Sequence, residues 1–159
     1  MAVRLMRERG DEILQSSAKT VTRFDSTLQR LVHDMFETMY HHHGIGLAAP
    51  QVGIAKRIIV VEVDEQKLAL VNPEIIWASG EESDVEGCLS WPGNFGEVKR
   101  RASIRVKAQN IHGEAIEVAA EGLLARCLQH EIDHLNGVLF CDIATRMLEK
   151  DPSVPPGNE

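Results

Sequence analysis

A pair of histidines four residues apart could hold a metal ion in the last third of the chain. The segment reads His130-Glu131-Ile132-Asp133-His134, and residues four apart on a helix lie one turn above each other. Both imidazoles can then face one ion, while Glu131 reaches a water bound to it, which suits metal-assisted hydrolysis. The alternative is a solvated helix face. The apolar neighbours Leu128 and Leu135 favour partial burial, where ionisable groups are costly unless they are paired or bound to metal.

Two imidazoles leave a catalytic divalent ion one ligand short of the usual three protein ligands plus water. Cys88 is the candidate for the third, because it lies in a loop-like segment, Glu86-Gly87-Cys88-Leu89-Ser90-Trp91-Pro92-Gly93. Glycine and proline there let the backbone approach a site closely. The alternative for Cys88 is a small buried hydrophobic residue, the common fate of a free cysteine.

A third segment brackets one amide side chain with small residues, Gly44-Ile45-Gly46-Leu47-Ala48-Ala49-Pro50-Gln51-Val52-Gly53. The backbone can pass close to a ligand here, and Gln51 offers an N–H pair as a donor. Considered alone, the segment is better explained as a tight turn between the first helix and the first strand. It lacks the lysine and the spacing of a phosphate loop.

Helical periodicity occurs on both sides of a β-rich middle. Apolar residues at three- and four-residue spacing predict a helix that begins at Ser26, with Gln29 completing a capping box, and ends before Gly44. Its last residues, His41 to His43, are interpreted as a solvated helix end rather than a metal site. The same spacing predicts a second helix over residues 121–136, with Gly137 as the residue that ends it.

The middle of the chain predicts short strands separated by turns. Asn72-Pro73, Pro92-Gly93 and His112-Gly113 supply the turn chemistry. Several connections are too short for parallel crossovers, which favours antiparallel or mixed pairing in an α+β fold. The predicted strands are residues 57–63, 68–72, 74–78, 103–108 and 115–119.

Length and composition predict one domain without a membrane segment. The 159 residues contain no internal repeat or linker before residue 150, so residues 1–150 are expected to form a single catalytic domain and residues 151–159 a flexible tail. There is no long apolar run and no apparent signal peptide. The odd count of three cysteines argues for a reducing compartment, so we expect a cytoplasmic protein. A net charge of −7 argues against stable nucleic acid binding.

Taken together, the three segments resemble the peptide deformylase family. The matching residues are Gly44-Ile45-Gly46-Leu47-Ala48-Ala49-Pro50-Gln51, Glu86-Gly87-Cys88-Leu89-Ser90 and Gln129-His130-Glu131-Ile132-Asp133-His134-Leu135, in the family's order. The resemblance implies a mixed α+β fold with mainly antiparallel sheets packed around a central metal-binding helix. It implies removal of the N-formyl group from the N-terminal methionine of formylated nascent polypeptides, with release of formate and transient ribosome contact.

The resemblance also implies a role for individual residues. Cys88, His130 and His134 would hold one divalent metal ion, Fe(II) in the cell, with Zn, Ni or Co as replacements. Glu131 would exchange protons with the attacking water and the departing amine. The Gln51 side chain and the Leu89 backbone N–H would stabilise the charge on the formyl oxygen. Substrate contacts would come from Ile45, Gly46 and Gly87 through the backbone, and from Leu123, Arg126 and Cys127 beside the methionine side chain.

Two other functions stay open at this point. A zinc peptidase shares the spacing of His130 and His134 but needs a further ligand downstream. A non-catalytic metal-binding module would need a closed site with four protein ligands, and the chain offers three candidates. Arg126 poses a separate question, because its charged head must either stay in solvent or pair with an acid.

Overall fold

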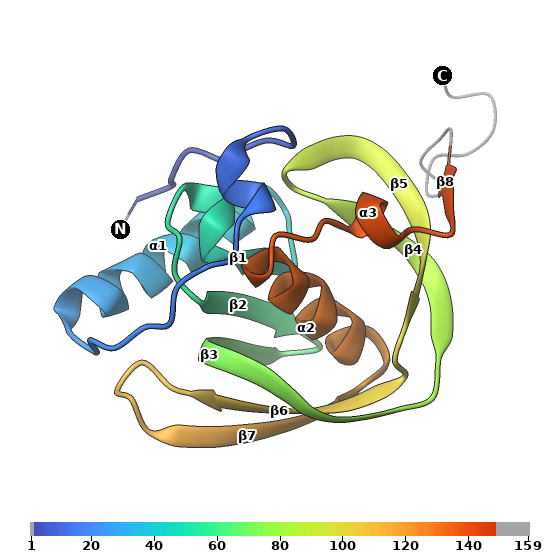
Figure 1. Cartoon of the computed structure of the whole chain (residues 1–159). Coiled ribbons are helices and arrows are strands. Elements are labelled where there is room, and N and C mark those ends of the chain that lie inside the picture. The colour runs from blue at the N-terminus through green and yellow to red at the C-terminus, as the bar shows by residue number, and fades with distance from the viewer. Residues whose placement is uncertain (1, 149–159) are drawn as a thin grey trace.

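One helix of the chain lies between two antiparallel sheets (Figure 1). The computed structural model describes residues 2–148; the tail expected at residues 151–159 lies outside them. The elements are η1 (Glu12–Gln15), α1 (Ser26–His41), β1 (Gly46–Ala48), η2 (Ala49–Val52), β2 (Ile58–Val63), β3 (Gln66–Ser79), β4 (Glu82–Cys88), β5 (Trp91–Arg100), β6 (Ser103–Gln109), β7 (Ala115–Glu121), α2 (Gly122–Leu135), α3 (Phe140–Ile143) and β8 (Arg146–Leu148).

The larger sheet has the strand order β1-β2-β3-β6-β7 and the smaller one β4-β5-β8. All pairs of neighbouring strands in both sheets are antiparallel. The predicted α+β class with mainly antiparallel sheets around a central helix is therefore confirmed. No helix among residues 2–148 is long and apolar enough to cross a membrane.

Strand β2 shows why the two long helices lie on opposite faces of the larger sheet. Successive side chains of a strand point to opposite faces. Ile59 and Val61 accordingly pack in the cluster that contains the apolar side of α2, whereas Ile58 and Val60 pack with α1. All four side chains are fully buried. The continuous apolar run of β2 is thus explained by burial on both faces.

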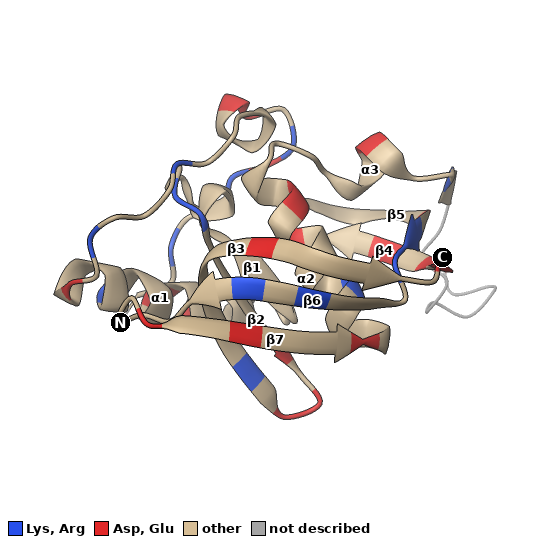
Figure 2. Ribbon diagram, turned by 60° about the horizontal axis from the view of Figure 1, so that its bottom comes forward, with Lys and Arg blue, Asp and Glu red and all other residues tan. Residues whose placement is uncertain are grey.

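Beyond α1, the outer face of the larger sheet carries charged side chains beside the half-exposed Trp77. Glu74 on β3 lies opposite Lys107 on β6, which in turn lies opposite Glu117 on β7. Figure 2 shows these charges of alternating sign across the neighbouring strands. Opposite charges on adjacent strands are mildly stabilising and suit a solvated face.

The turn predicted at Asn72-Pro73 is wrong. Strand β3 runs through it, with a shift in its pairing with β6 between Val71 and Glu74. Asn72 adopts a left-handed backbone, φ +53°. Its amide side chain exchanges hydrogen bonds with the backbone of Val21 at 2.8 and 2.9 Å, so it compensates for the disrupted ladder.

The loop expected around Cys88 is instead a β-hairpin. Strand β4 ends at Cys88, β5 begins at Trp91, and the turn lies at Leu89 and Ser90 rather than at Pro92-Gly93. The turn at His112-Gly113 is confirmed between β6 and β7. Strands β4 and β5 escaped prediction because they are rich in polar residues and glycine and lack the apolar alternation of a strand on a core.

Helix α1 begins at Ser26 as predicted and ends at His41, but the residues that cap it differ from the prediction by one position at each end. Asp25, not Ser26, is the N-cap, and its carboxylate accepts a hydrogen bond from Leu28 N–H at 3.0 Å. At the other end His43, not Gly44, is the left-handed residue, φ +57°. His41, His42 and His43 are all exposed, as expected for a solvated helix end.

Helix α2 ends as predicted at a left-handed glycine. Gly137, φ +76°, donates to the His134 carbonyl, and Val138 donates to the Asp133 carbonyl. A Cβ at Gly137 would lie 2.6 Å from the backbone oxygen of Gln15. Glycine is therefore required here both for its backbone angle and for close packing against the segment that precedes α1.

Substituting Gly137 tests this packing. Gly137→Ala is expected to lower the free energy of unfolding by about 2–5 kcal/mol, because left-handed strain and a backbone clash add together. Gly93→Ala is the matched control: φ is +79° and the added Cβ meets nothing within 4 Å, so about 1–2 kcal/mol is expected. Urea unfolding measures both, and equal losses would contradict the packing argument.

Candidate active site

Helix α2 carries two of the three candidate ligands. His130 and His134 have ring centroids 5.0 Å apart, and both side chains are buried. They are buried because the apolar residues of the same helix, Leu124, Leu128 and Leu135 among them, pack on the larger sheet. The helical spacing predicted from the sequence thus brings both imidazoles into the interior of the molecule.

Cys88 joins them from the end of β4. Its Sγ lies 3.3 Å from His134 Nε2, and one ligand atom from each of Cys88, His130 and His134 lies within 4.8 Å of the others. The pairing of β4 with β5 shifts between Gly87 and Cys88, where the strand turns. One thiolate and two imidazoles form a donor set that suits zinc, iron, nickel or cobalt. These residues therefore fit a divalent metal ion.

Glu131 lies beside this cluster with spare hydrogen-bonding capacity. The side chain is 4% exposed, and Oε1 is buried without a hydrogen-bond partner among residues 2–148. Burial raises the pKa of Glu131 to about 7, although the neighbouring His130 opposes the shift. A carboxyl group with this pKa can both accept and release a proton near neutral pH.

Gly46 on β1 packs closely against Glu131 and Cys127 of α2. A Cβ at Gly46 would lie 2.5 Å from Glu131 Oε2 and 2.7 Å from Cys127 Sγ. Only glycine lets β1 pass this close to α2. Burial, followed by the charges of Glu131 and Glu86, raises the pKa of the Cys127 thiol well above its ordinary value. Cys127 is therefore neutral in this contact.

Gln51 lies on η2 with its amide held from two sides. Its Oε1 accepts a hydrogen bond from Ala48 N–H at 2.9 Å, and its Nε2 donates to Ser90 Oγ at 3.1 Å. Nε2 also lies 3.6 Å from Cys88 Sγ. The side chain is almost completely buried. The amide donor is thereby fixed beside the candidate metal ligands and the turn that contains Leu89.

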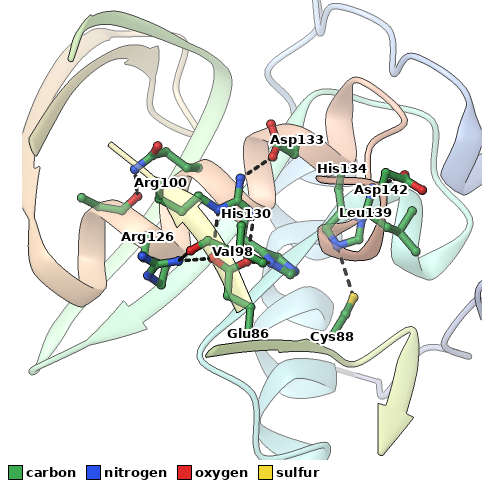
Figure 3. Close-up of polar contacts among 12 residues, drawn as sticks. Glu86, Cys88, Val98, Arg100, Arg126, His130, Asp133, His134, Leu139 and Asp142 are labelled. Carbon is green, nitrogen blue, oxygen red and sulfur yellow. Dashed lines mark hydrogen bonds and ion pairs between the residues drawn. The ribbon is translucent and has the colours of Figure 1, made fainter. Parts of the chain in front are cut away.

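A charged cluster around Glu86 holds the His130 ring through its Nδ1 atom (Figure 3). Arg100 donates to both carboxylate oxygens of Glu86, at 2.9 and 2.8 Å, and Arg126 donates to one of them at 2.7 Å. His130 Nδ1 donates to Glu86 Oε1 at 2.8 Å. Arg100 also pairs with Asp133. An acid that orients the far nitrogen of a histidine ligand is a common support of metal sites.

The electrostatics of Glu86 follow from these partners. Burial alone would raise its pKa, but hydrogen bonds and charges from Arg100 and His130 outweigh burial and lower the pKa to about 2. Sequence reasoning missed this role of Glu86. The residue stood in the segment matched to the family, but nothing in the local pattern indicated its partners Arg100 and Arg126.

The expected substrate residues line one cavity of about 520 Å³ that opens beside the ligands. Arg126 reaches it with its stem, because its head is turned to Glu86 and to the carbonyls of Val98 and Glu82. The open question about Arg126 is answered by this pairing with an acid. The cavity includes these predicted site residues: Ile45, Gly46, Gln51, Gly87, Cys88, Leu89, Leu123, Arg126, Cys127, His130 and Glu131.

His43, Asn94 and Phe95 also line the cavity and were not expected from the sequence. His43 is exposed at the end of α1, and the other two belong to β5. Asn94 and Phe95 gave no signal because β5 itself was not predicted, whereas His43 was interpreted only as part of a solvated helix end.

Known proteins of one family match almost the whole chain in sequence and in fold. The family model described as polypeptide deformylase matches residues 3–150. A peptide deformylase of Acetivibrio thermocellus is 52% identical over 151 residues, 95% of this chain and 89% of the relative. One of Heliobacterium modesticaldum is 55% identical over 142 residues, 89% of this chain and 94% of the relative. The crystal structure of peptide deformylase from Thermotoga maritima superposes with a TM-score of 0.88 at 47% identity, covering 90% of this chain and 98% of that one.

Removing the charge of Glu86 tests its place in the cluster. Glu86→Gln is expected to lower the free energy of unfolding at pH 7 by about 3–5 kcal/mol, because Arg126 loses its counter-charge and Arg100 keeps only Asp133. The folded-state pKa of Glu86 is lowered from 4.5 to about 2. Its contribution is therefore present above the unfolded-state pKa and is lost as pH falls from about 4.5 toward 2.

Urea unfolding of both proteins between pH 7 and pH 3 measures this. The difference between wild type and Glu86→Gln should shrink below pH 4.5. A difference that stays constant with pH would contradict the ionised state assigned to Glu86. Surface Glu117→Gln is the control, and it should change stability by less than about 0.5 kcal/mol.

Proposed function

Since the chain belongs to the polypeptide deformylase family, we propose that Cys88, His130 and His134 hold one divalent metal ion and that this ion is Fe(II) in the cell. The enzyme is a metal-dependent hydrolase that removes the N-formyl group from the N-terminal methionine of newly synthesised proteins and releases formate. The observation that carries the ligand assignment is the convergence of one sulfur and two nitrogen atoms within 4.8 Å. Zn, Ni or Co would replace Fe(II) in the same donor set.

When bound, the ion supplies a Lewis acid that lowers the pKa of a water and polarises the formyl group. Three protein ligands would leave one coordination position of the ion for that water. A closed structural site would instead have four protein ligands. Among residues 2–148, only Cys88, His130 and His134 gather as a potential ligand group. The downstream ligand that a zinc peptidase would need is absent from this group.

Glu131 moves the proton in the proposed mechanism. Its unpartnered Oε1 is the atom available to a water beside His130 and His134. Glu131 accepts a proton from the water as the water oxygen attacks the formyl carbon, and then gives that proton to the departing amine nitrogen. Burial favours the protonated form of Glu131 by raising its pKa to about 7, and a bound divalent ion would favour the ionised form that accepts the proton.

Gln51 and Leu89 stabilise the charge that develops on the formyl oxygen. The Gln51 amide is held by Ala48 and Ser90, so its Nε2 needs no reorientation during the reaction. The Leu89 backbone N–H lies in the turn next to Cys88. Preorganised donors of this kind each contribute about 2.7–4 kcal/mol to transition-state stabilisation.

The cavity provides the proposed binding site for the methionine and the peptide that follows it. Backbone groups of Ile45, Gly46 and Gly87 contact the extended peptide. Leu123, Cys127 and the aliphatic stem of Arg126 face the methionine side chain, with His130 at the inner end. The stem is free for this apolar contact because the guanidinium is already paired with Glu86.

We place this activity in the cytoplasm, with formylated nascent chains as substrate and a transient contact with the ribosome. The net charge of −7 and the charges of mixed sign on the outer face of the larger sheet favour a brief encounter over a strong hold on RNA (Figure 2). Recognition then depends on the formylated end of the nascent chain.

Replacing Glu131 separates metal binding from proton transfer. Glu131→Gln should keep its metal but lose at least about 10²-fold in turnover, because the water loses its base. Formate release from formyl-Met-Ala-Ser, with metal analysis of the same sample, measures both properties. Turnover near the wild-type rate would remove Glu131 from the proton-transfer role. The unformylated peptide Met-Ala-Ser serves as the substrate control and should not be cleaved.

Oxygen sensitivity tests the proposed metal. Enzyme loaded anaerobically with Fe(II) should lose activity in air, because Fe(II) reacts with oxygen and thereby promotes oxidation of the Cys88 thiolate beside it. Enzyme loaded with Ni(II) should keep its activity under the same exposure, since its metal is not readily oxidised. Formate release measured over several hours compares the two, and a stable iron enzyme in air would count against Fe(II) held by a thiolate.

A further inference from the structure

The N-terminal arm, residues 2–18, contacts each of the three segments that carry the site. Arg7 N–H donates to the Gln51 carbonyl at 2.7 Å, and Arg9 N–H donates to the Ser90 carbonyl at 2.8 Å. Ala18 N–H donates to the Leu135 carbonyl, at the end of α2, also at 2.8 Å. In Figure 1 the dark blue arm runs beside η2 and reaches toward the β4–β5 turn. The arm therefore joins segments that are far apart in the sequence.

The arm is itself held at its beginning. Ala2 N–H donates to Asp34 Oδ1 at 2.9 Å, and Arg4 N–H donates to Thr38 Oγ1 at 2.8 Å. The Arg4 guanidinium pairs with Asp34 at 3.0 Å. Asp34 and Thr38 lie on consecutive turns of α1 and are both buried. This end of the arm is thus fixed to α1, away from the candidate ligands.

The arm is also held at its other end. Asp11 caps the short helix η1, and Leu14 of that helix is fully buried. Residues 7–9 lie between these two anchors. A segment that is anchored at both ends is rigid enough to position the groups that its backbone contacts between the anchors.

The middle of the arm meets the two segments that contain the proposed oxyanion donors. Ser90 is held by the Arg9 N–H through its carbonyl and by Gln51 Nε2 through its hydroxyl. The Arg9 guanidinium also lies over the Trp91 ring, 4.3 Å from its centroid. Cys88 and Trp91 flank the turn whose Leu89 N–H is the second donor. The arm therefore restrains the end of this turn at Ser90 and Trp91. Cys88 restrains its other end through the candidate metal site.

We propose that residues 7–9 are a positioning strap that sets the Gln51 amide and the Leu89 N–H at the distances required to stabilise the formyl oxygen. The inference rests on the oxyanion role proposed above for Gln51 and Leu89. The strap acts chiefly through the main-chain N–H groups of Arg7 and Arg9, and the contact of the Arg9 guanidinium with Trp91 is secondary. Displacement of a positioned group by about 1 Å costs up to about 10²-fold in rate.

Proline substitutions remove the two N–H donors but also fix φ and restrict the preceding residue, so a neighbouring proline variant is needed as a control. Arg7→Pro and Arg9→Pro should each lower kcat for formyl-Met-Ala-Ser at least tenfold, with KM changed by less than threefold and metal content unchanged. Glu8→Pro is the matched control, because the Glu8 N–H makes no hydrogen bond within residues 2–148. Arg7→Ala and Arg9→Ala keep the N–H and should stay within threefold of wild type.

A second measurement uses the unaltered protein and does not depend on the folding of the proline variants. Binding of a peptidyl hydroxamate should slow hydrogen exchange of the Arg7 and Arg9 amides at least fivefold, because coupling between strap and donors is reciprocal. The Ala2 and Arg4 amides, bound to α1, should not respond. No change at Arg7 and Arg9 would overturn the coupling.

The remaining outcomes separate this inference from the proposed function. If Arg7→Pro and Arg9→Pro lose thermal stability but match Glu8→Pro in kcat below their unfolding temperature, the arm is structural and the positioning role is wrong. Loss of metal in either proline variant would also overturn it, since the strap is assigned to the donors and not to the ligands. Gln51→Leu with wild-type kcat would instead refute the oxyanion role of Gln51 itself.

Discussion

Burial of the Glu86 carboxylate is the constraint on which the arrangement of the site depends. A buried charge is tolerated only when it is paired and hydrogen-bonded. Glu86 on β4 meets this condition through Arg100 on β5 and through Arg126 and His130 on α2. The cluster therefore joins the smaller sheet to the central helix through charge-assisted hydrogen bonds.

The cluster also determines where the candidate metal ligands meet. Side chains two residues apart on a strand share a face, so an anchored Glu86 directs Cys88 toward the same side of β4. Figure 3 shows both side chains pointing toward α2. His130 Nδ1 is occupied by Glu86, which leaves Nε2 as the candidate ligand atom of this imidazole. One ion cluster thus fixes the strand that carries the thiol and the orientation of one imidazole.

Close backbone approach completes the site from the other side. Gly46 lets β1 lie against Glu131 and Cys127, and main-chain donors of the N-terminal arm hold the Gln51 and Ser90 segments. These contacts involve backbone atoms or the absence of a side chain. Such contacts can be made by many residue types, so they cannot be recognised from the sequence. The N-terminal segment accordingly added nothing to the recognised motifs.

The sequence alone determined what depends on local spacing. The i, i+4 relation of His130 and His134 follows from the helical repeat, and the apolar residues beside them predict the buried helix. Their local segments made Cys88 and Gln51 candidates with alternatives left open, and the family resemblance gave them roles and added Leu89. Tertiary structure alone decided the pairing of Glu86 with Arg100 and Arg126, and the β4–β5 hairpin. Strand pairing and ion clusters join residues distant in the chain, so their energies depend on packing that no local pattern encodes.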